Sequence, residues 1–446
     1  MITKVEALNF RCLHYVDQPL RPFHILVGPN ASGKTTFLDV ISFISQLVSK
    51  GLDVAINERT KNFQDLVWGR TGQRFEMAVE ARVPDSIRTK FPPSQVFETI
   101  RYEIAIGFER VGQQVGILEE RIVLKGTMDN SNQPLQRDFF PIFFPSPATL
   151  VSKGEKSIYT VINKVRDGND YFKIELPQVG PKRGAKSDAL PGFDPSESEK
   201  KTTNSAKNWQ YAFKLGTQKS ALGNLPADET QFPATTWLRN LLTEGVQPIV
   251  LNSLLIRQAS QPGQGLKFKP DGSNLPWVIE DLFQRDRTRF GAWLAHLQTA
   301  LPDIENIRTI EREDDRHRYL VVEYKGGLRV PSWLVSDGTL RLLALTLPAY
   351  LPNIEGIYLI EEPENGIHPR AVETVFQSMS SVYDAQILMA SHSPVILGIA
   401  KAEDILCFAK TLEGATDIVA GNLHPALQDW KGETNLGVLF ASGVLG

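Results

Sequence analysis

The fold class is decided by the stretch Gly28-Pro29-Asn30-Ala31-Ser32-Gly33-Lys34-Thr35. It fits the phosphate-binding pattern G-x-x-x-x-G-K-[ST], in which glycines let backbone N–H groups curl around a phosphate. The context fits as well, because the apolar run 23–27 before it predicts a buried strand, and residues 37–48 after it carry apolar side chains at helical spacing. A helix that begins at such a loop adds the partial positive charge of its N-terminus. The sequence therefore predicts an α/β P-loop fold that binds a nucleoside triphosphate.

The side chains of this loop have separate expected tasks. Lys34 is expected to reach the β- and γ-phosphate oxygens and to take part in catalysis, and the Thr35 hydroxyl is expected to ligate Mg²⁺. The predicted nucleotide-binding residues of the loop are Gly28, Asn30, Ser32, Gly33, Lys34, Thr35 and Thr36. A chance glycine-rich turn is the alternative, and the match of motif and context together argues against it.

A hydrophobic segment near the other end of the chain finishes in two acids: Ile357-Tyr358-Leu359-Ile360-Glu361-Glu362-Pro363. It predicts a buried strand that delivers both carboxylates at its end. Glu361 is predicted to ligate the metal, and Glu362 is predicted to be the catalytic residue that orients or activates the attacking water. Paired acids after an apolar strand also occur at solvated strand ends, so the argument depends on the motifs around them.

Two further motifs stand at set distances from these acids. The segment 335–341, VSDGTLR, lies upstream of them, and the segment 390–393, ASHS, lies downstream. The glycine of the first lies 23 positions before Glu361, and the histidine of the second lies 30 positions after Glu362. Each has a simpler explanation alone, since Ser-Asp-Gly could cap a helix and a lone histidine is more often structural. Their order behind a P-loop argues against coincidence.

With these motifs the sequence resembles the ABC-type ATPases of the SMC- and RecF-like branch, including its short stand-alone OLD-like members from anti-phage defence systems. The resemblance covers the two ends of the chain and implies one ATPase head built from both, with ATP and Mg²⁺ as cofactors. Ser336, Asp337 and Gly338 then stand in the signature loop, which contacts the γ-phosphate of ATP bound by a second protomer. His392 takes the place of the catalytic switch histidine. This family analogy is associational.

The same resemblance assigns three further positions. Residues 365–368, NGIH, correspond to the D-loop, Arg11 to an arginine that approaches the nucleotide, and Gln64 to the Q-loop glutamine, which is the third expected metal ligand beside Thr35 and Glu361. The chain departs from the family pattern in two places. Glu361 stands where aspartate is usual, and its extra methylene could alter how the metal shell is held. The signature reads S-D-G-T in place of S-G-G-Q, which favours the defence and repair branch over transporter subunits.

The chain is expected to divide into two halves of one ATPase head, 1–125 and 303–446, separated by an insertion at 126–302. The insertion holds 15 prolines, and each interior proline costs a helix about 3 kcal/mol. We therefore expect a mixed α+β insertion without a long coiled coil.

Composition narrows the class of protein further. The chain has 446 residues, a formal net charge of −3 and 42% hydrophobic residues, which is the profile of a soluble globular protein. Cys12 and Cys407 are its two cysteines, too few for a disulfide framework or a cysteine-based zinc site. No apolar run approaches the ~20 residues of a membrane span. We expect a cytoplasmic protein with no membrane partner.

One segment is locally basic although the whole chain is nearly neutral. Residues 177–219 hold eight basic and four acidic residues, with Trp209, Tyr211 and Phe213 among them. Lys182–Lys219 is therefore a candidate DNA contact, since basic residues interleaved with aromatic ones suit single-stranded nucleic acid. A solvated loop packed by three aromatic side chains is the alternative.

The resemblance also implies partners. It implies a head-to-tail homodimer, or a higher homo-oligomer, with two ATP molecules between protomers. OLD nucleases carry a nuclease domain behind the ATPase, but only 54 residues follow His392 here, so a nuclease or other effector is expected to be a separate subunit. The expected function is an ATPase that senses or organises DNA and controls this effector, in anti-phage defence. A RecF-type repair or recombination ATPase acting directly on DNA is the alternative. A transporter energiser is disfavoured, because the insertion would obstruct docking on a membrane subunit.

Overall fold

The segment around the glycine-rich loop folds as strand, loop and helix, as predicted. The computed structural model describes residues 1–92, 97–109, 114–126, 136–152, 158–166, 168–176, 211–352, 354–427, 436–441 and 443. Strand β3 (Phe23–Val27) leads into the loop, and helix α1 (Lys34–Lys50) begins at its lysine. Phe37, Ile41 and Ile44 belong to the broad apolar face that α1 buries. This face holds the helix, and therefore the loop, in a fixed place.

Strand β3 lies inside a six-stranded sheet of order β10-β14-β15-β3-β16-β17, in which the first five strands are parallel and β17 runs antiparallel to β16. Its other strands are β10 (Val246–Ile249), β14 (Gly356–Glu361), β15 (Ala385–Ala390), β16 (Ile405–Lys410) and β17 (Thr416–Ala420). Parallel strands end at the same edge of a sheet. The glycine-rich loop, the paired acids and the histidine motif therefore meet at one edge.

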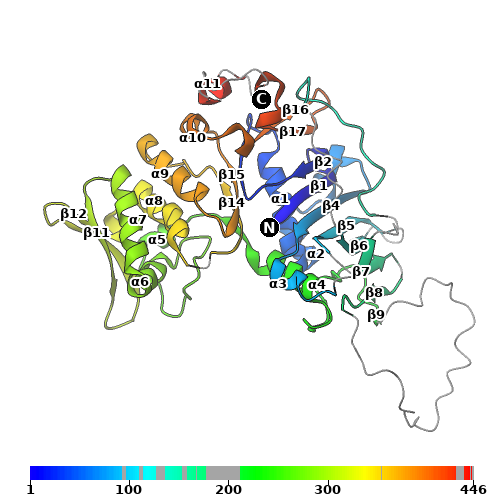
Figure 1. Cartoon of the computed structure of the whole chain (residues 1–446), viewed down its shortest axis with the longest axis horizontal. Coiled ribbons are helices and arrows are strands. Elements are labelled where there is room, and N and C mark those ends of the chain that lie inside the picture. Colours follow the sequence, from blue (N-terminus) through cyan, green and yellow to red (C-terminus); the bar gives the residue numbers. More distant parts are fainter. Residues whose placement is uncertain are drawn as a thin grey trace, which may run out of the picture.

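A second, antiparallel sheet packs across α1 (Figure 1). In sheet order, its eight strands are β2 (Leu13–Pro19), β1 (Ile2–Phe10), β4 (Arg74–Arg82), β5 (Thr99–Phe108), β6 (Val115–Lys125), β7 (Ile158–Val165), β8 (Asp170–Phe172) and β9 (Tyr211–Phe213). Phe43 of α1 stacks edge-on against Phe10 and Phe75 of this sheet, and Phe37 packs against Phe408 of the six-stranded sheet. One hydrophobic core thus joins both sheets through α1.

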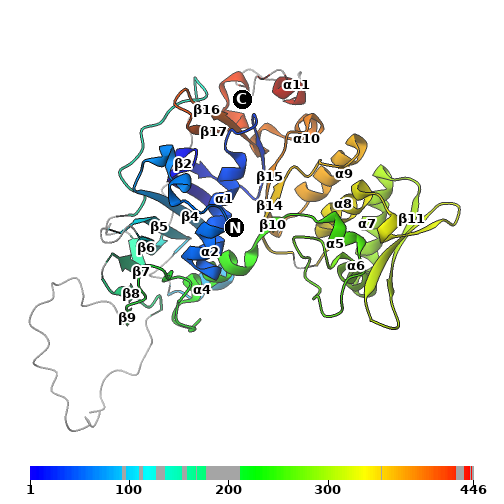
Figure 2. The same ribbon diagram turned by 180° about the vertical axis from the view of Figure 1, so that it is seen from behind.

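A helical lobe covers the opposite face of the six-stranded sheet, away from the antiparallel sheet (Figure 2). It contains α5 (Ser253–Arg257), α6 (Leu275–Arg285), α7 (Arg287–Ala300), α8 (Asp337–Thr346), α9 (Pro369–Ser380) and α10 (Pro394–Ile399), with a small sheet of β11 (Ile304–Glu311), β12 (Arg318–Tyr324) and β13 (Arg329–Pro331). Trp293 is fully buried at its centre and donates its Nε1–H to Thr346 Oγ1 at 2.9 Å. The remaining helices are α2 (Leu52–Asn57), α3 (Asp85–Arg88), α4 (Pro233–Asn240) and α11 (Leu436–Ala441). Helix α11 packs against α10.

The expected insertion, 126–302, contributes to three parts of the molecule and does not form one body. Its strands β7 to β9 extend the antiparallel sheet, β10 forms the edge of the six-stranded sheet, and α5 to α7 belong to the helical lobe. The reason is physical: the open edges of β6 and β14 offer unpaired backbone groups, and these strands satisfy them. The absence of a coiled-coil arm is confirmed for the described residues, where the longest helix is α1 with 17 residues. None of the described helices is long and apolar enough to cross a lipid bilayer.

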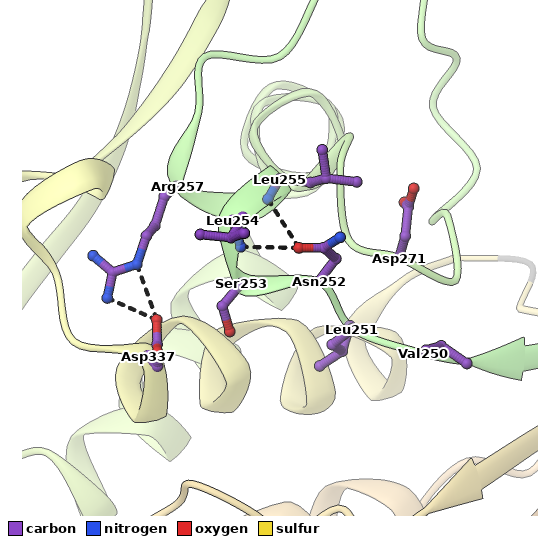
Figure 3. Close-up of a pocket in the computed structure, with 9 residues that line it drawn as sticks. All are labelled: Val250, Leu251, Asn252, Ser253, Leu254, Leu255, Arg257, Asp271 and Asp337. Atoms are coloured by element: carbon purple, nitrogen blue, oxygen red, sulfur yellow. Dashed lines mark hydrogen bonds and ion pairs between the residues drawn. The ribbon is translucent and has the colours of Figure 1, made fainter.

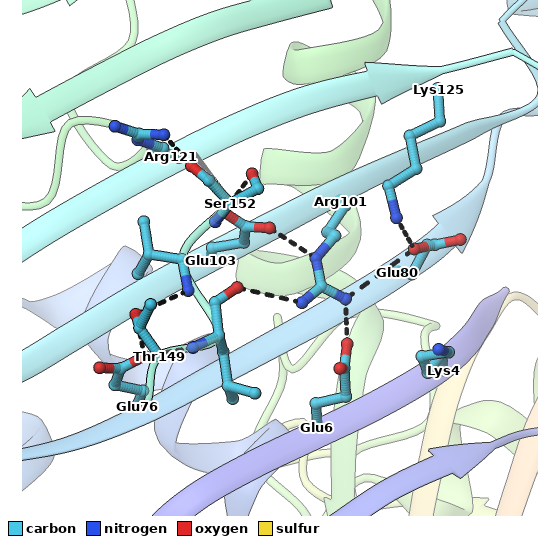
Figure 4. A network of polar contacts seen from close by, with 12 residues as sticks. Lys4, Glu6, Glu76, Glu80, Arg101, Glu103, Arg121, Lys125, Thr149 and Ser152 are labelled. Carbon is cyan, nitrogen blue, oxygen red and sulfur yellow. Dashed lines mark hydrogen bonds and ion pairs between the residues drawn. The ribbon is translucent and has the colours of Figure 1, made fainter. Parts of the chain in front are cut away.

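A buried charge network lies on the outer face of the antiparallel sheet (Figure 4). The Arg101 guanidinium, only 8% exposed, forms ion pairs with Glu6 and with Glu103, the latter at 2.6 Å. Burial alone would lower the pKa of Arg101, but the two carboxylates outweigh it and raise that pKa. Lys125 pairs with Glu80 at 2.7 Å at the edge of the network. These contacts join side chains of four neighbouring strands, β1, β4, β5 and β6.

Candidate nucleotide-binding site

The glycine-rich loop is held by the two strands at the far side of the six-stranded sheet. A Cβ on Gly28 would lie 2.2 Å from the Phe408 carbonyl oxygen, and one on Gly33 would lie 2.3 Å from Thr416 Oγ1. Gly33 also has a φ of 107°, which L-residues with a side chain rarely adopt. The same Thr416 Oγ1 donates to the Ser32 carbonyl at 2.9 Å. Both glycines are therefore required by close approach as well as by backbone geometry.

Lys34 is folded back onto the loop that it follows. Its Nζ donates to the carbonyl oxygens of Gly28 and Pro29 at 2.8 and 2.9 Å. Burial lowers the pKa of Lys34, and the carboxylates of Glu362 and Glu361 oppose that shift. The ammonium group thus stands between the loop and the two acids, where phosphate oxygens could replace the carbonyl oxygens as its acceptors.

Two of the three predicted metal ligands, Thr35 and Glu361, face each other directly. Thr35 Oγ1 donates to Glu361 Oε2 at 2.5 Å, so the longer glutamate reaches the hydroxyl despite replacing the usual aspartate. The described residues contain no group of three or more His, Cys, Asp or Glu side chains that could hold a metal by itself. Mg²⁺ does not require such a group, since it is usually bound through one or two carboxylates together with substrate phosphates. The oxygen donors of Thr35 and Glu361 fit that chemistry.

Glu362 is presented by an unusual backbone conformation. Its φ is 47°, in the left-handed region, and its N–H donates to the Ala390 carbonyl oxygen at 2.8 Å. The Asn365 side chain donates to Glu362 Oε2. Strained backbone of this kind is concentrated at functional sites, where surrounding contacts hold it in place.

His392 lies beside this acid on the neighbouring strand end. Burial lowers the pKa of His392, with Lys34 adding to the effect and Glu362 and Glu364 opposing it. Glu364 Oε1 accepts from the His392 N–H at 2.8 Å and from Ser391 Oγ at 2.9 Å, which fixes the loop. Burial therefore favours the neutral imidazole, which can both accept and donate a hydrogen bond.

These residues surround one cavity of about 490 Å³. It is lined by Cys12, Asn30, Ala31, Gly33, Lys34, Thr35, Thr36, Glu361, Glu362, Ala390 and His392. A neighbouring cavity of about 520 Å³ shares Asn30, Glu362 and His392 with it and extends along the D-loop segment. The structure thus brings the loop residues, both acids and the histidine together, as the sequence motifs predicted.

Arg11 and Gln64, two further predicted site residues, do not line the cavity that contains Lys34. The Arg11 guanidinium forms an ion pair with Asp39 at 3.0 Å and lines a separate cavity of about 390 Å³, which touches the first at Thr35 and Glu361. Gln64 lines neither cavity. With its amide nitrogen turned toward its own loop, it donates to the carbonyl oxygens of Arg70 and Gly72 at 3.0 and 3.2 Å. Its assignment as the Q-loop glutamine stays a prediction without support from these contacts.

The signature segment opens α8, at some remove from the Lys34 cavity. Ser336 Oγ accepts from the Thr339 N–H at 3.2 Å and caps the helix. A Cβ on Gly338 would lie 2.6 Å from the Gly366 carbonyl oxygen, so the signature and D-loop segments touch through glycines. Asp337 lines a different cavity, shown in Figure 3. The signature residues and the P-loop of one chain therefore do not share a cavity.

The segment after β10 was missed by sequence reasoning. Ile249 pairs with Ile360, so the chain leaves the sheet beside Glu361. Val250 lines the cavity that contains Thr35 and Glu361, and Arg257 forms an ion pair with Asp337 at 2.7 Å. No motif marks this segment. The short apolar run 249–251 before a capping asparagine is the one local signal for a strand end and helix start.

Comparison with known proteins shows the family to which this chain belongs. Residues 23–398 match the AAA_21 family, described as "AAA domain, putative AbiEii toxin, Type IV TA system". The chain belongs to this family. As a member of AAA_21 it is a P-loop ATPase of the OLD-like kind, and the resemblance inferred from its motifs is confirmed.

Three further proteins show similarity to this AAA_21 chain. The OLD nuclease of Thermus scotoductus is 46% identical over 44 residues, which make up 10% of this chain and 8% of that protein. The crystal structure of an Smc head bound to the C-winged helix domain of ScpA matches with a TM-score of 0.50 and 12% identity, covering 94% of this chain and 96% of that one. An Smc head domain with an extended coiled coil, derived from Pyrococcus furiosus, gives a TM-score of 0.44 and 12% identity, with 94% and 95% coverage. The predicted α/β head fold is therefore confirmed.

Proposed function

We propose that this chain binds and hydrolyses ATP with Mg²⁺ and uses the cycle to control a separate effector. The observation that carries the proposal is the arrangement at one sheet edge: the Thr35–Glu361 contact, with Lys34, Glu362 and His392 around the same cavity. In this cavity the P-loop backbone and Lys34 would hold the phosphates, and Thr35 and Glu361 would hold Mg²⁺. Bound Mg²⁺ would neutralise charge on the β- and γ-phosphates.

Glu362 and His392 are proposed to act on the water and the γ-phosphate. The carboxylate of Glu362 would accept a proton from the attacking water, and Asn365 would keep that carboxylate oriented. His392, which lines the same cavity, would hydrogen-bond the γ-phosphate and report whether it is present. Hydrolysis removes this contact, so the conformation of the loop after β15 depends on the nucleotide.

The signature residues support a dimer. Asp337 and Gly338 lie at the start of α8 and do not line the Lys34 cavity of their own chain. We propose a head-to-tail homodimer in which each signature faces the ATP of the other protomer, with two nucleotides at the interface. The dimer would close with ATP and reopen after hydrolysis.

The effector and the biological setting are proposed from the family. The family description names a toxin, and the short match is to an OLD nuclease. We propose that the ATPase senses or organises DNA in anti-phage defence and controls a separate nuclease or other effector subunit, in the cytoplasm. The candidate DNA contact, Lys182–Lys219, lies mostly outside the described residues; Tyr211 and Phe213 at its end form β9.

Substitution of Glu362 by glutamine tests the ATPase proposal. This variant should bind ATP with unchanged affinity, dimerise with ATP, and hydrolyse at least ~100-fold more slowly, because the base is lost while the shape is kept. Glu355→Gln is the matched control, since it makes the same change in an exposed residue just before the amino end of the same strand. Lys34→Ala should abolish ATP binding altogether.

Two results would overturn parts of this proposal. Unchanged turnover in Glu362→Gln would remove that residue from catalysis. A monomeric Glu362→Gln at saturating ATP, measured by light scattering after gel filtration, would exclude the head-to-tail dimer. ATP-dependent DNA binding by the chain alone, without an effector, would favour the RecF-type alternative.

A further inference from the structure

A cavity of about 580 Å³ lies between the segment after β10 and the start of α8, and Figure 3 shows the residues around it. It is lined by Val250, Leu251, Asn252, Ser253, Leu254, Leu255, Arg257, Asp271 and Asp337. Arg257 is the cation of this lining, and Asp271 and Asp337 are its acids. Without the guanidinium, two carboxylates would face any molecule that approaches the signature.

Arg257 is held in a defined orientation. Its Nε and Nη2 donate to Asp337 Oδ1 at 2.9 and 2.7 Å, and its Nη1 donates to the Trp333 carbonyl oxygen at 3.1 Å. Ser332 Oγ donates to the backbone carbonyl of Arg257 at 2.8 Å. A guanidinium carries five N–H donors, so two remain beyond these three. The side chain is 26% exposed and lines the cavity.

The ion pair gives a reason why an aspartate is tolerated in the signature. The Asp337 side chain is 59% exposed at the first turn of α8. A lone carboxylate there would repel a phosphate, whereas the pair with Arg257 has no net charge and presents N–H donors. Arginine suits this task because its planar guanidinium can donate two parallel hydrogen bonds to one phosphate group.

We propose that Arg257 binds the γ-phosphate of ATP held by a second copy of this chain, with Asp337 as the residue that orients its guanidinium. This inference rests on the head-to-tail dimer proposed above and adds a residue that lies 80 positions from the signature in sequence. The ligand of the cavity is thus a triphosphate presented by the P-loop of another protomer.

Apolar side chains around the ion pair favour a second protein surface over a free anion. Val250, Leu254 and Leu334 are 71%, 72% and 70% exposed. Leu254 and Val250 line the cavity, and Leu334 lies in the turn that accepts the Arg257 hydrogen bond. Exposed apolar side chains gathered beside polar ones mark surfaces that bind another protein. The charges are complementary as well, since the occupied P-loop of the second copy is anionic and Arg257 is cationic.

The test compares the two partners of the ion pair in the Glu362→Gln background. Arg257→Ala and Arg257→Gln should weaken ATP-dependent dimerisation by at least about tenfold, because a charged hydrogen bond to the partner's phosphate is lost. Asp337→Ala keeps the cation and should weaken it by less than about threefold. Dimer affinity is measured by analytical ultracentrifugation. Binding of a fluorescent ATP analogue to the dilute monomer should stay within about twofold in all three variants, because Arg257 does not line the Lys34 cavity.

A merely structural ion pair would give a different pattern. If the pair only fixes α5 on α8, then Arg257→Ala and Asp337→Ala remove the same contact and weaken the dimer equally, and the proposal is overturned. Should the alanine variant unfold in thermal denaturation, Arg257→Lys decides: it keeps the charge and is expected to dimerise more tightly than Arg257→Gln. Equal dimerisation of these two variants would also refute the assignment. A monomeric Glu362→Gln parent would instead refute the dimer on which the inference rests.

Discussion

Replacing Arg101 with methionine should cost the fold about 3–5 kcal/mol, the range seen when one partner of a buried ion pair is removed. The guanidinium is 8% exposed, and the side chains of Glu6 and Glu103 are 9% and 0% exposed. Methionine fills most of the volume, so the loss comes from two carboxylates left without their cation. Glu103 keeps its hydrogen bonds from the Ser152 N–H and hydroxyl, which favours the lower half of the range.

Lys125→Met is the matched control for this prediction. This substitution also leaves one carboxylate, that of Glu80, without its cation, which lies 2.7 Å away in the native chain. The Lys125 side chain is 32% exposed, so water can replace its ammonium group. We expect a cost below about 1 kcal/mol there. Urea unfolding followed by circular dichroism at pH 7.5 gives both free energies of unfolding. Equal costs for the two variants, or a cost below about 1 kcal/mol for Arg101→Met, would refute the view that this network is buried and interdependent.

Two further predictions concern the loop and the pH dependence of stability. Gly33→Ala should abolish ATP binding and lower the free energy of unfolding by about 2–4 kcal/mol, because its Cβ would lie 2.3 Å from Thr416 Oγ1 at a φ of 107°; Thr416→Ala should recover part of that stability, and no recovery would contradict the proposed clash. Burial raises the pKa of Glu175 from 4.5 to about 7, although Thr235 and Ala234 donate hydrogen bonds to it. Since the folded chain then binds this proton more tightly than the unfolded chain, the contribution is largest below pH 4.5 and is lost as the pH rises to about 7. Glu175→Gln should therefore remove up to ~3 kcal/mol of the fall in stability between pH 4.5 and 7, and an unchanged pH profile in urea unfolding would contradict it.

The nucleotide site could be predicted from sequence because its parts are local motifs and the sheet is parallel. Lys34, Glu361 and His392 each follow a short apolar strand, and parallel strands bring their ends together whatever lies between them. Their position around one cavity could therefore be predicted with little knowledge of contacts between distant parts of the chain. The order of β10, β14, β15 and β3 in the sheet was not needed to predict it.

The other parts of the structure depend on contacts that no sequence motif predicts. The strands of 126–302 join the edges of sheets formed by distant residues, and their pairing partners have no sequence signal. Arg257 meets Asp337 across 80 positions, and its segment follows β10, which pairs in parallel with β14. For Gln64, residue type and position in the sequence suggested a role, but its described contacts are to its own loop, so that role stays a prediction.

The support of the glycine-rich loop by β17 has a consequence for biosynthesis. Thr416 donates its hydroxyl to the Ser32 carbonyl and its backbone N–H to the Cys12 carbonyl, both at 2.9 Å. The loop is translated early, but the strand that holds it is made almost 400 positions later. A nascent chain therefore cannot complete its ATP site until residue 416 has left the ribosome. Incomplete translation products would lack the two hydrogen bonds by which Thr416 supports the loop.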